Sequence, residues 1–365
     1  MTVWTNPYAV IPLVGIAVVA VAFLLRPVAW KVGLVDRPGG RKQHRQPTPL
    51  LGGSATFLVF LVVAPLAGVP RHEWLALVLA GGVVFAAGLV DDIREISPGK
   101  RFLAQGVAAL LIWFVGGVGL TSLGNLTGSG DIQLGVLALP FTVFCTLGVI
   151  NATNMTDGLD GLAGGTLLIV FGIFYSLAVE KGYTEEARLL LLLCGVLAGF
   201  LLLNFRFHDA LPARIFMGDA GTLFFGLVAA WYLMRFTQAP YHIIRPITAV
   251  WVFALPLMDT VTIMTRRVIA GRSPFEPDRE HLHHLLRRLG FDVSSTVFFL
   301  LGTILLLASI GFVGEKYDVP EWVMFYGFLA LFALYFVAMH LAWKRLNADQ
   351  AQLPNARRPV HYESS

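Results

Sequence analysis

Residues 151–165 read N-A-T-N-M-T-D-G-L-D-G-L-A-G-G, a stretch of asparagines, aspartates and glycines inside an otherwise apolar part of the chain. Apolar runs at 139–150 and 167–179 flank it, so its polar groups must lie where a membrane span meets water or inside a protein cavity. If a helix begins at Asp157, then Asp157 and Asp160 project from one face of it. Two carboxylates on one face repel each other, and a cation between them, or a ligand hydrogen-bonded to one of them, would remove that cost.

The composition is that of an integral membrane protein. Hydrophobic residues make up 56% of the 365, charged residues make up 14%, and the mean hydropathy is +0.71. Several apolar runs exceed the roughly 18 residues that indicate a span. Cys145 and Cys194 both lie in such runs, which indicates small buried side chains rather than a disulfide or a metal site. The run at 8–25 carries its first charge, Arg26, behind it, the reverse of a signal peptide, so we expect a retained span.

Eleven apolar runs have spanning length, and they predict an all-α polytopic fold with about eleven transmembrane helices. Their approximate bounds are 8–25, 51–69, 74–90, 102–120, 134–150, 161–179, 187–203, 215–234, 246–264, 296–314 and 322–342. The odd-numbered connections between them hold 21 of the 27 Lys and Arg residues. The positive-inside rule then places the N-terminus outside and the C-terminus in the cytoplasm. We expect one transmembrane domain over residues 1–346 and a disordered cytoplasmic tail over 347–365.

The topology also limits the function classes. The net charge of +4 follows from the basic cytoplasmic connections, so it does not indicate nucleic-acid binding. A channel or transporter would be expected to place polar groups near the middle of the bilayer, often in repeated halves, whereas this sequence has no internal repeat and its polar motifs lie on cytoplasmic connections. The pattern favours an enzyme over a transporter of a lipid-linked or nucleotide solute, which is the alternative class.

Two acidic motifs follow or open predicted spans. Asp91 and Asp92 directly follow the third run. An acidic helix end paired with nearby basic residues is the simpler interpretation, and carboxylates that serve a metal-bound diphosphate are the functional one. Asp219 lies between glycines at the start of the eighth run, where backbone N–H groups favour anions and a carboxylate could hold a magnesium ion that bridges phosphate oxygens. Phe216, just before it, is either a core residue or a platform that stacks on a base.

The longest cytoplasmic segment contains a histidine cluster. After two prolines, residues 278–289 predict a short helix stopped by Gly290, with His281 and His284 on one face and His283 pointing elsewhere. Three histidines so close suggest zinc, but no cysteine is near and the surroundings are basic. Histidines and arginines aimed at phosphates fit better, and Arg279 belongs to this group.

Two further polar features are less specific. The first cytoplasmic loop, which includes His44, either sets topology through its basic residues or binds a phosphate or a lipid headgroup. Asp259 lies inside the ninth run, where a charge costs about 2.5–3.5 kcal/mol on insertion scales. We expect Asp259 to face the bundle interior and to pair with Arg266, which is two turns further along the same helix face.

Four motifs in order over residues 36–290 resemble the polyprenyl-phosphate N-acetylhexosamine-1-phosphate transferase superfamily, also called glycosyltransferase family 4. They are DD after the third run, N-x-x-N-M-x-D-G-x-D-G-L, F-M-G-D-A-G and S-P-F-x-P-D-x-x-H-L-H-H. The last motif is most similar to the WecA/TagO branch, which uses UDP-GlcNAc. The resemblance implies transfer of GlcNAc-1-phosphate from UDP-GlcNAc to undecaprenyl phosphate at the cytoplasmic face of the bacterial inner membrane. It also implies release of UMP, a need for Mg²⁺ with Mn²⁺ as a substitute, and a possible homodimer. Another UDP-N-acetylhexosamine or another polyprenyl acceptor is the alternative within this class.

The resemblance also implies roles for individual residues. The residues with implied roles are Asp219 and Asn154 as magnesium ligands, Asp160 and Phe216 as uracil-binding groups, Asp91 and Asp92 at the acceptor phosphate, Arg101 near the phosphates, and His281, His283 and His284 at the diphosphate and sugar. Further candidates for substrate binding are His44, Asp157, Arg266 and Arg279. A phosphate monoester has a second pKa near 6 and is already largely dianionic at about pH 7. We therefore expect Asp91 and Asp92 to position the acceptor or to accept a proton only transiently.

Overall fold

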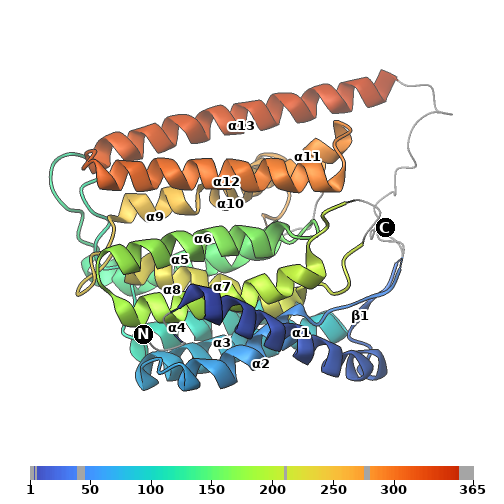
Figure 1. Cartoon of the computed structure of the whole chain (residues 1–365). Coiled ribbons are helices and arrows are strands. Elements are labelled where there is room, and N and C mark those ends of the chain that lie inside the picture. Colours follow the sequence, from blue (N-terminus) through green and yellow to red (C-terminus); the bar gives the residue numbers. More distant parts are fainter. Residues whose placement is uncertain (1–3, 5, 39–45, 209–211, 275–279, 353–365) are drawn as a thin grey trace.

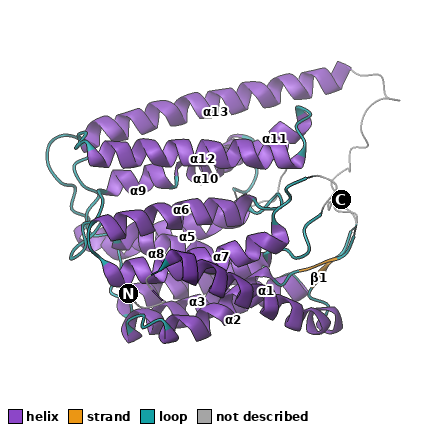
Figure 2. Cartoon of the chain, viewed as in Figure 1, coloured by secondary structure: helices purple, strands orange, loops and turns teal. Residues whose placement is uncertain are grey.

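The computed structural model describes residue 4 and residues 6–38, 46–208, 212–274 and 280–352. These residues form a bundle in which the long helices lie side by side along one common direction (Figure 1). The described strands are β1 (Val35–Asp36) and β2 (Thr48–Pro49), which pair antiparallel at one end of the bundle (Figure 2). The predicted helical class is confirmed.

The helices follow the apolar runs of the sequence. Their bounds are α1 (Pro7–Val32), α2 (Gly52–Leu66), α3 (Arg71–Arg94), α4 (Pro98–Phe114), α5 (Ala138–Thr156), α6 (Leu162–Glu180), α7 (Thr184–Asn204), α8 (Gly218–Arg235), α9 (Pro246–Val252), α10 (Ala254–Ile269), α11 (Leu282–Arg288), α12 (Val293–Lys316) and α13 (Glu321–Gln352), with the 3₁₀ turn η2 (Gly135–Leu137) before α5. Local capping sets some of these ends. Asn6 accepts from the N–H of Tyr8 at the start of α1, and Asp292 accepts from that of Ser295 at the start of α12.

Seven helices of the described chain are long and apolar enough to cross a membrane. They are α1, α3, η2 with α5, α6, α7, α12 and α13, and the bent pair α9–α10 makes eight if it counts as one span. All eleven predicted runs contain helix, but α2, α4 and α8 have only 15, 17 and 18 residues and are not among these spans, and a straight span needs about 20. The chain is a polytopic membrane protein, and the number eleven stays a prediction.

The ninth apolar run is two helices rather than one. α9 and α10 meet at Phe253 with a bend of 80°. Pro256 lies four residues after Val252, the last residue of α9. A proline has no N–H to bond the carbonyl four residues earlier, and its ring clashes with that carbonyl, so a helix breaks there. The bend turns α10 out of line with α9, and α10 carries Asp259.

α8 is the centre of the bundle. It packs against α2, α3, α5 and α6, and of all its residues only Asp219 is not buried. The helix is apolar on every side, which is the pattern of a fully enclosed helix. Asp219 therefore marks the one point at which this central helix is open to solvent.

A buried ion cluster joins three helices at the other end of α8. The guanidinium of Arg235 donates to Glu186 at 2.7 and 3.0 Å, and it also contacts Glu73 and the hydroxyl of Tyr241. The side chains of Arg235, Glu73 and Glu186 are each no more than 5% exposed. Charges removed from water in this way persist only when they are paired, so the cluster ties α3 and α7 to the last turn of α8.

Candidate active site

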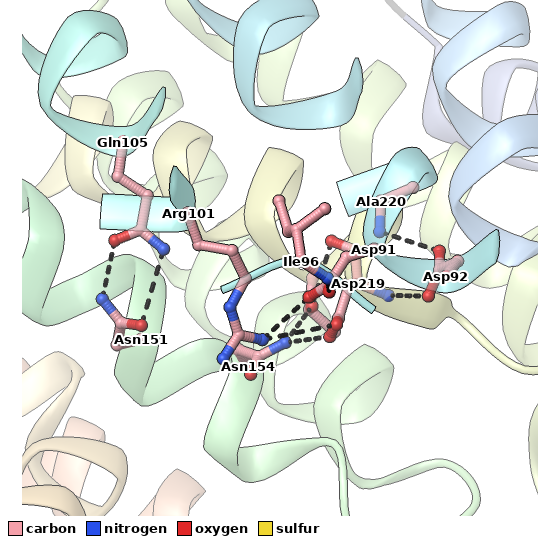
Figure 3. Close-up of polar contacts among 10 residues, drawn as sticks. Asp91, Asp92, Ile96, Arg101, Gln105, Asn151, Asn154, Asp219 and Ala220 are labelled. Carbon is pink, nitrogen blue, oxygen red and sulfur yellow. Dashed lines mark hydrogen bonds and ion pairs between the residues drawn. The ribbon is translucent and has the colours of Figure 1, made fainter. Parts of the chain in front are cut away.

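The start of α8 is capped by a carboxylate from another helix. Oδ1 of Asp92 accepts from the backbone N–H of Asp219 at 2.8 Å, and Oδ2 accepts from that of Ala220 at 3.1 Å (Figure 3). The first N–H groups of a helix have no partner within it, and the helix dipole favours a negative charge beside them. Asp92, at the end of α3, therefore fixes where α8 begins and where the Asp219 side chain lies.

Glycines let α2 and α3 approach this first turn closely. A Cβ atom at Gly88 of α3 would lie 2.5 Å from the backbone nitrogen of Ala220, and one at Gly53 of α2 would lie 2.3 Å from that of Gly221. Gly218 itself has a φ of +72°, a conformation that side chains with a Cβ rarely adopt. The backbone at the start of α8 is thus held from two sides without intervening side chains.

Asp91, Arg101, Asn154 and Asp219 meet beside this turn (Figure 3). Asp91 accepts from Nη1 of Arg101 at 2.9 Å and from the backbone N–H of Ile96 at 2.7 Å. The same Nη1 lies 3.5 Å from Oδ2 of Asp219. Nδ2 of Asn154 donates to Oδ1 of Asp219 at 2.6 Å. The structure therefore brings together predicted site residues from α3, α4, α5 and α8.

A paired amide contact holds α4 against α5 next to this cluster. Nδ2 of Asn151 donates to Oε1 of Gln105 at 2.8 Å. Gln105 lies one turn after Arg101 in α4, and Asn151 lies one turn before Asn154 in α5. Residues three or four apart share a helix face, so this contact places Arg101 and Asn154 opposite each other.

The donor chemistry of the cluster fits magnesium. Asp219 and Asn154, the two predicted ligands, are neighbours, and carboxylate and amide oxygens are among the hard donors that Mg²⁺ prefers. In this structure the amide nitrogen of Asn154 faces Asp219, so the amide would have to turn over to present its oxygen to the ion. Within the described part of the chain, no group of three or more His, Cys, Asp or Glu side chains is arranged to hold a metal. Mg²⁺ commonly takes only one or two carboxylates from the protein and shares the rest of its shell with water and substrate phosphates. The residues suit such a shared site rather than a closed protein cage.

The connection between α5 and α6 carries Asp157 and Asp160. It is a turn, so the prediction of a helix that begins at Asp157 was wrong. The two carboxylates therefore share no helix face. Asp157 is half-buried, and burial, followed by the charges of Asp219 and Asp160, raises the pKa of its carboxyl to about 7. Near neutral pH this group therefore divides between its protonated and ionised forms.

Two residues that were not predicted, Asn204 at the end of α7 and Arg206 just after it, organise the same connection. Nε and Nη2 of Arg206 both donate to Oδ2 of Asp160, at 3.0 and 2.6 Å. Asn204 accepts from the N–H of Gly161 at 2.7 Å and donates to the carbonyl of Ile215 at 2.9 Å. Their position in the sequence could have indicated a role in the site, because both follow the apolar run 187–203 on the predicted cytoplasmic side, which carries the other motifs.

The first loop reaches the same region through its backbone. The N–H of Phe216 donates to the carbonyl of Pro49 at 2.9 Å, and its own carbonyl accepts from the N–H of Gly52 at 2.8 Å. Phe216, predicted to stack on uracil, thus lies directly before α8. The predicted substrate-binding residues His44 and Arg279 lie outside the described residues.

The three histidines form one contiguous group at the start of α11. The ring of His281 stacks on that of His283 at 5.6 Å with 8° between the planes, and the rings of His283 and His284 are 4.1 Å apart. The prediction that His283 points away from the other two was wrong. His281 has an extended backbone and precedes the helix, so helical spacing does not apply to it.

The expected pair of Asp259 and Arg266 was also wrong. Nδ1 of His281 lies 2.7 Å from Oδ2 of Asp259, while Nη2 of Arg266 pairs with Glu280 at 2.8 Å. The segment that holds Glu280 and His281 folds back over α10 and supplies the partners of both residues. The predicted pair along one face of α10 does not form, because both residues bind a later part of the chain instead.

The histidine group touches the 157–161 connection. A Cβ atom at Gly158 would lie 2.2 Å from Nε2 of His283. Burial, followed by the neighbouring His284 and His281 rings, holds the pKa of His283 well below its usual range. His283 is therefore a neutral ring wedged against the turn that carries Asp157 and Asp160.

Comparison with known proteins agrees with these motifs. Residues 74–237 match the family model described as glycosyl transferase family 4. Three similar proteins are each named undecaprenyl-phosphate alpha-N-acetylglucosaminyl 1-phosphate transferase. The one from Yersinia pestis is 38% identical over 89% of this chain and 89% of its own length. The one from Escherichia coli strain K12 is 38% identical over 88% of each chain, and the one from Haemophilus influenzae is 39% identical over 88% of this chain and 90% of its own.

Proposed function

Because the chain belongs to glycosyl transferase family 4, we propose that it transfers N-acetylglucosamine 1-phosphate to undecaprenyl phosphate in a membrane. The observation that carries the proposal is the meeting of Asp91, Arg101, Asn154 and Asp219 at one end of the bundle, within the segment that the family model matches. The similar proteins are named for this reaction, and the similarity extends over almost their whole lengths.

The donor in this proposal is UDP-GlcNAc and the released product is UMP. An oxygen of the acceptor phosphate attacks the phosphorus that carries the sugar, and the bond from that phosphorus to the UMP oxygen breaks. Both partners are anions, so the site must offset charge and align the two phosphates more than it must form a covalent intermediate. Arg101 is placed to offset charge, and Asp92, with both oxygens bonded to the start of α8, is placed to hold Asp219 still.

Magnesium, or manganese in its place, belongs to the same proposal. Asp219 and Asn154 would hold it, and when bound it offsets the negative charge of the phosphate oxygens. Asp91 binds Arg101 and the N–H of Ile96, so its contacts support a role in holding Arg101.

The membrane arrangement is proposed as eleven passes through the bacterial inner membrane, with the N-terminus outside and the site facing the cytoplasm. The distribution of Lys and Arg supports this orientation. The start of α1 and the end of α13 lie at opposite ends of the bundle, as an odd number of passes requires (Figure 1). Many apolar side chains of α1 and α13 are exposed, which suits contact with lipid.

The test is release of UMP by the purified protein. Folded protein in detergent, incubated with undecaprenyl phosphate, UDP-GlcNAc and Mg²⁺, is expected to release UMP and to form a lipid-linked sugar diphosphate. Parallel reactions with UDP-GalNAc, and with a shorter polyprenyl phosphate, compare the alternative substrates. No UMP from any of these mixtures, in a preparation with a cooperative thermal transition, would reject the transferase proposal.

Asp160→Ala is expected to weaken binding of the nucleotide sugar more than it slows turnover. The predicted role of Asp160 is a hydrogen bond to uracil, and loss of one bond to a charged group corresponds to a rise of about tenfold in KM for UDP-GlcNAc. The change in kcat should stay within about threefold. Steady-state kinetics against Asp131→Ala, an exposed aspartate in the connection before α5, provides the comparison. Equal losses in kcat and 1/KM would contradict the assignment.

Gly158→Ala is expected to lower kcat at least about tenfold, because displacement of a catalytic group by about 1 Å can cost as much as a hundredfold. The added methyl group collides with Nε2 of His283 and must push that ring away. Gly172→Ala in α6 is the matched control, since a Cβ atom there has no neighbour within 4 Å. Wild-type kinetics for Gly158→Ala would show that the position of His283 is unimportant.

A further inference from the structure

Asp259 is held by three donors from two parts of the chain, the histidine segment and α13. Its Oδ2 lies 2.7 Å from Nδ1 of His281. Its Oδ1 accepts from the backbone N–H of Leu282 at 3.1 Å and from the hydroxyl of Tyr335 in α13 at 2.7 Å. We propose that Tyr335 is a positioning residue for the transfer reaction, which acts by fixing Asp259 and, through it, the ring of His281. This inference rests on the proposed function.

The chemistry of the contact determines which nitrogen of His281 is left free. An ionised carboxylate only accepts hydrogen bonds, so Nδ1 of His281 carries the proton that points to Asp259. Nε2 is then the atom available to a ligand. A carboxylate held by a single donor can rotate, whereas one that also accepts from Leu282 and Tyr335 has a fixed plane. Tyr335 therefore restricts the orientation of the His281 ring through Asp259.

The position of the His281 ring matters to its neighbours. It stacks nearly parallel on His283, and His283 lies against Gly158 in the turn that carries Asp160. Rotation of His281 would disturb both contacts. The path from Tyr335 thus runs through side chains in direct contact to the turn at the candidate site.

A second contact joins α13 directly to the segment that carries His281. Nε1 of Trp343 donates to the carbonyl of Glu280, the residue before His281, at 2.9 Å. Trp343 is buried, although most side chains of α13 are exposed or half-buried. Tyr335 and Trp343 are eight residues apart, close to two helical turns, so both project toward the histidine segment from one face of α13. This face lies far outside the segment that the family model matches.

The test removes one hydroxyl group. Tyr335→Phe is expected to lower kcat about tenfold and to leave KM for UDP-GlcNAc within about twofold, the size and split expected when one hydrogen bond that aligns a reacting group is lost. Tyr326→Phe is the matched control, because it deletes the same atom from an exposed tyrosine of the same helix and should be unchanged. Equal kinetics for the two variants would overturn the proposal.

A double variant separates positioning from general damage. If Tyr335 acts through His281, then Tyr335→Phe should cost nothing further in a His281→Gln background. A further tenfold loss in that background would overturn the proposal, as would a loss in Tyr335→Phe that follows its thermal transition rather than its kinetics. Asp259→Asn gives a second measurement, since it offers His281 an amide in place of a carboxylate and is expected to lower kcat at least as much as Tyr335→Phe.

A readout without turnover keeps the two proposals distinguishable. In protein with ¹⁵N-labelled histidine, the Nδ1 signal of His281 should shift in Tyr335→Phe and stay in place in Tyr326→Phe. An unchanged signal in Tyr335→Phe would overturn the positioning role, whatever the assay shows. A wild-type protein that released no UMP would overturn the proposed function, and the His281 signal would still decide the role of Tyr335.

Discussion

Asp219→Asn is expected to lower kcat by about a thousandfold, the upper range seen when one electrostatic contact to a reacting group is removed. Asp219 is the one residue of α8 that is not buried, and Asn154 and Arg101 both converge on its carboxylate. The substitution keeps the shape and removes the charge that the proposed magnesium site requires. Initial rates of UMP release over a range of Mg²⁺ concentrations measure the effect.

The fold of this variant should be intact, because Asp92 bonds to the backbone of residue 219 and not to its side chain. The thermal transition of Asp219→Asn is therefore expected to match that of wild type. Asp131→Asn makes the same chemical change on an exposed loop and should keep full activity. Turnover of Asp219→Asn within about tenfold of wild type would show that Asp219 is not part of the catalytic centre.

Arg235→Ala is expected to destabilise the protein by about 3–5 kcal/mol, the usual cost of removing one partner from a buried ion pair. The substitution leaves Glu73 and Glu186 without their shared cation in a part of the bundle closed to water. It also removes the ion pairs that join Glu73 of α3 and Glu186 of α7 to the last turn of α8. Denaturant titration of the purified protein, followed by circular dichroism, measures the change.

Two comparisons make this result specific to the cluster. Arg71→Ala removes an exposed arginine from the first turn of α3, near Glu73, and should change stability by less than about 0.5 kcal/mol. A triple variant, Arg235→Met with Glu73→Gln and Glu186→Gln, removes all three charges and should recover much of the loss. An Arg235→Ala protein as stable as wild type would mean that the cluster contributes nothing.

The helices were predictable because long apolar runs impose them. Within a membrane every backbone polar group must bond inside its own segment, so a run of that length has few alternatives to a helix. The bend at Phe253 was not predicted, although Pro256 was visible, because a proline near a span can be tolerated with only a small kink. The motif residues Asp91, Asn154 and Asp219 were also predicted to lie at one end, since topology placed their connections on one side.

Pairings between distant segments could not be predicted. Asp92 as the cap of α8, Arg206 as the partner of Asp160, and His281 as the partner of Asp259 each join residues whose separation in sequence follows no helical period. Such contacts depend on how helices pack, and packing depends on close approaches such as that at Gly88. Local pattern identifies the polar residues, but three-dimensional packing decides their partners.

The burial of every residue of α8 except Asp219 has a consequence for the electric field at the site. Behind Asp219 every residue of the helix is buried and nearly all are apolar, so solvent screens the charges of the Asp91, Arg101 and Asp219 cluster mainly from one direction. Low-dielectric walls on the other sides concentrate the field toward that opening. In the proposed reaction the nucleotide and the lipid phosphate would therefore both meet this field on the solvent side of Asp219, and dissolved salt would weaken their attraction only there.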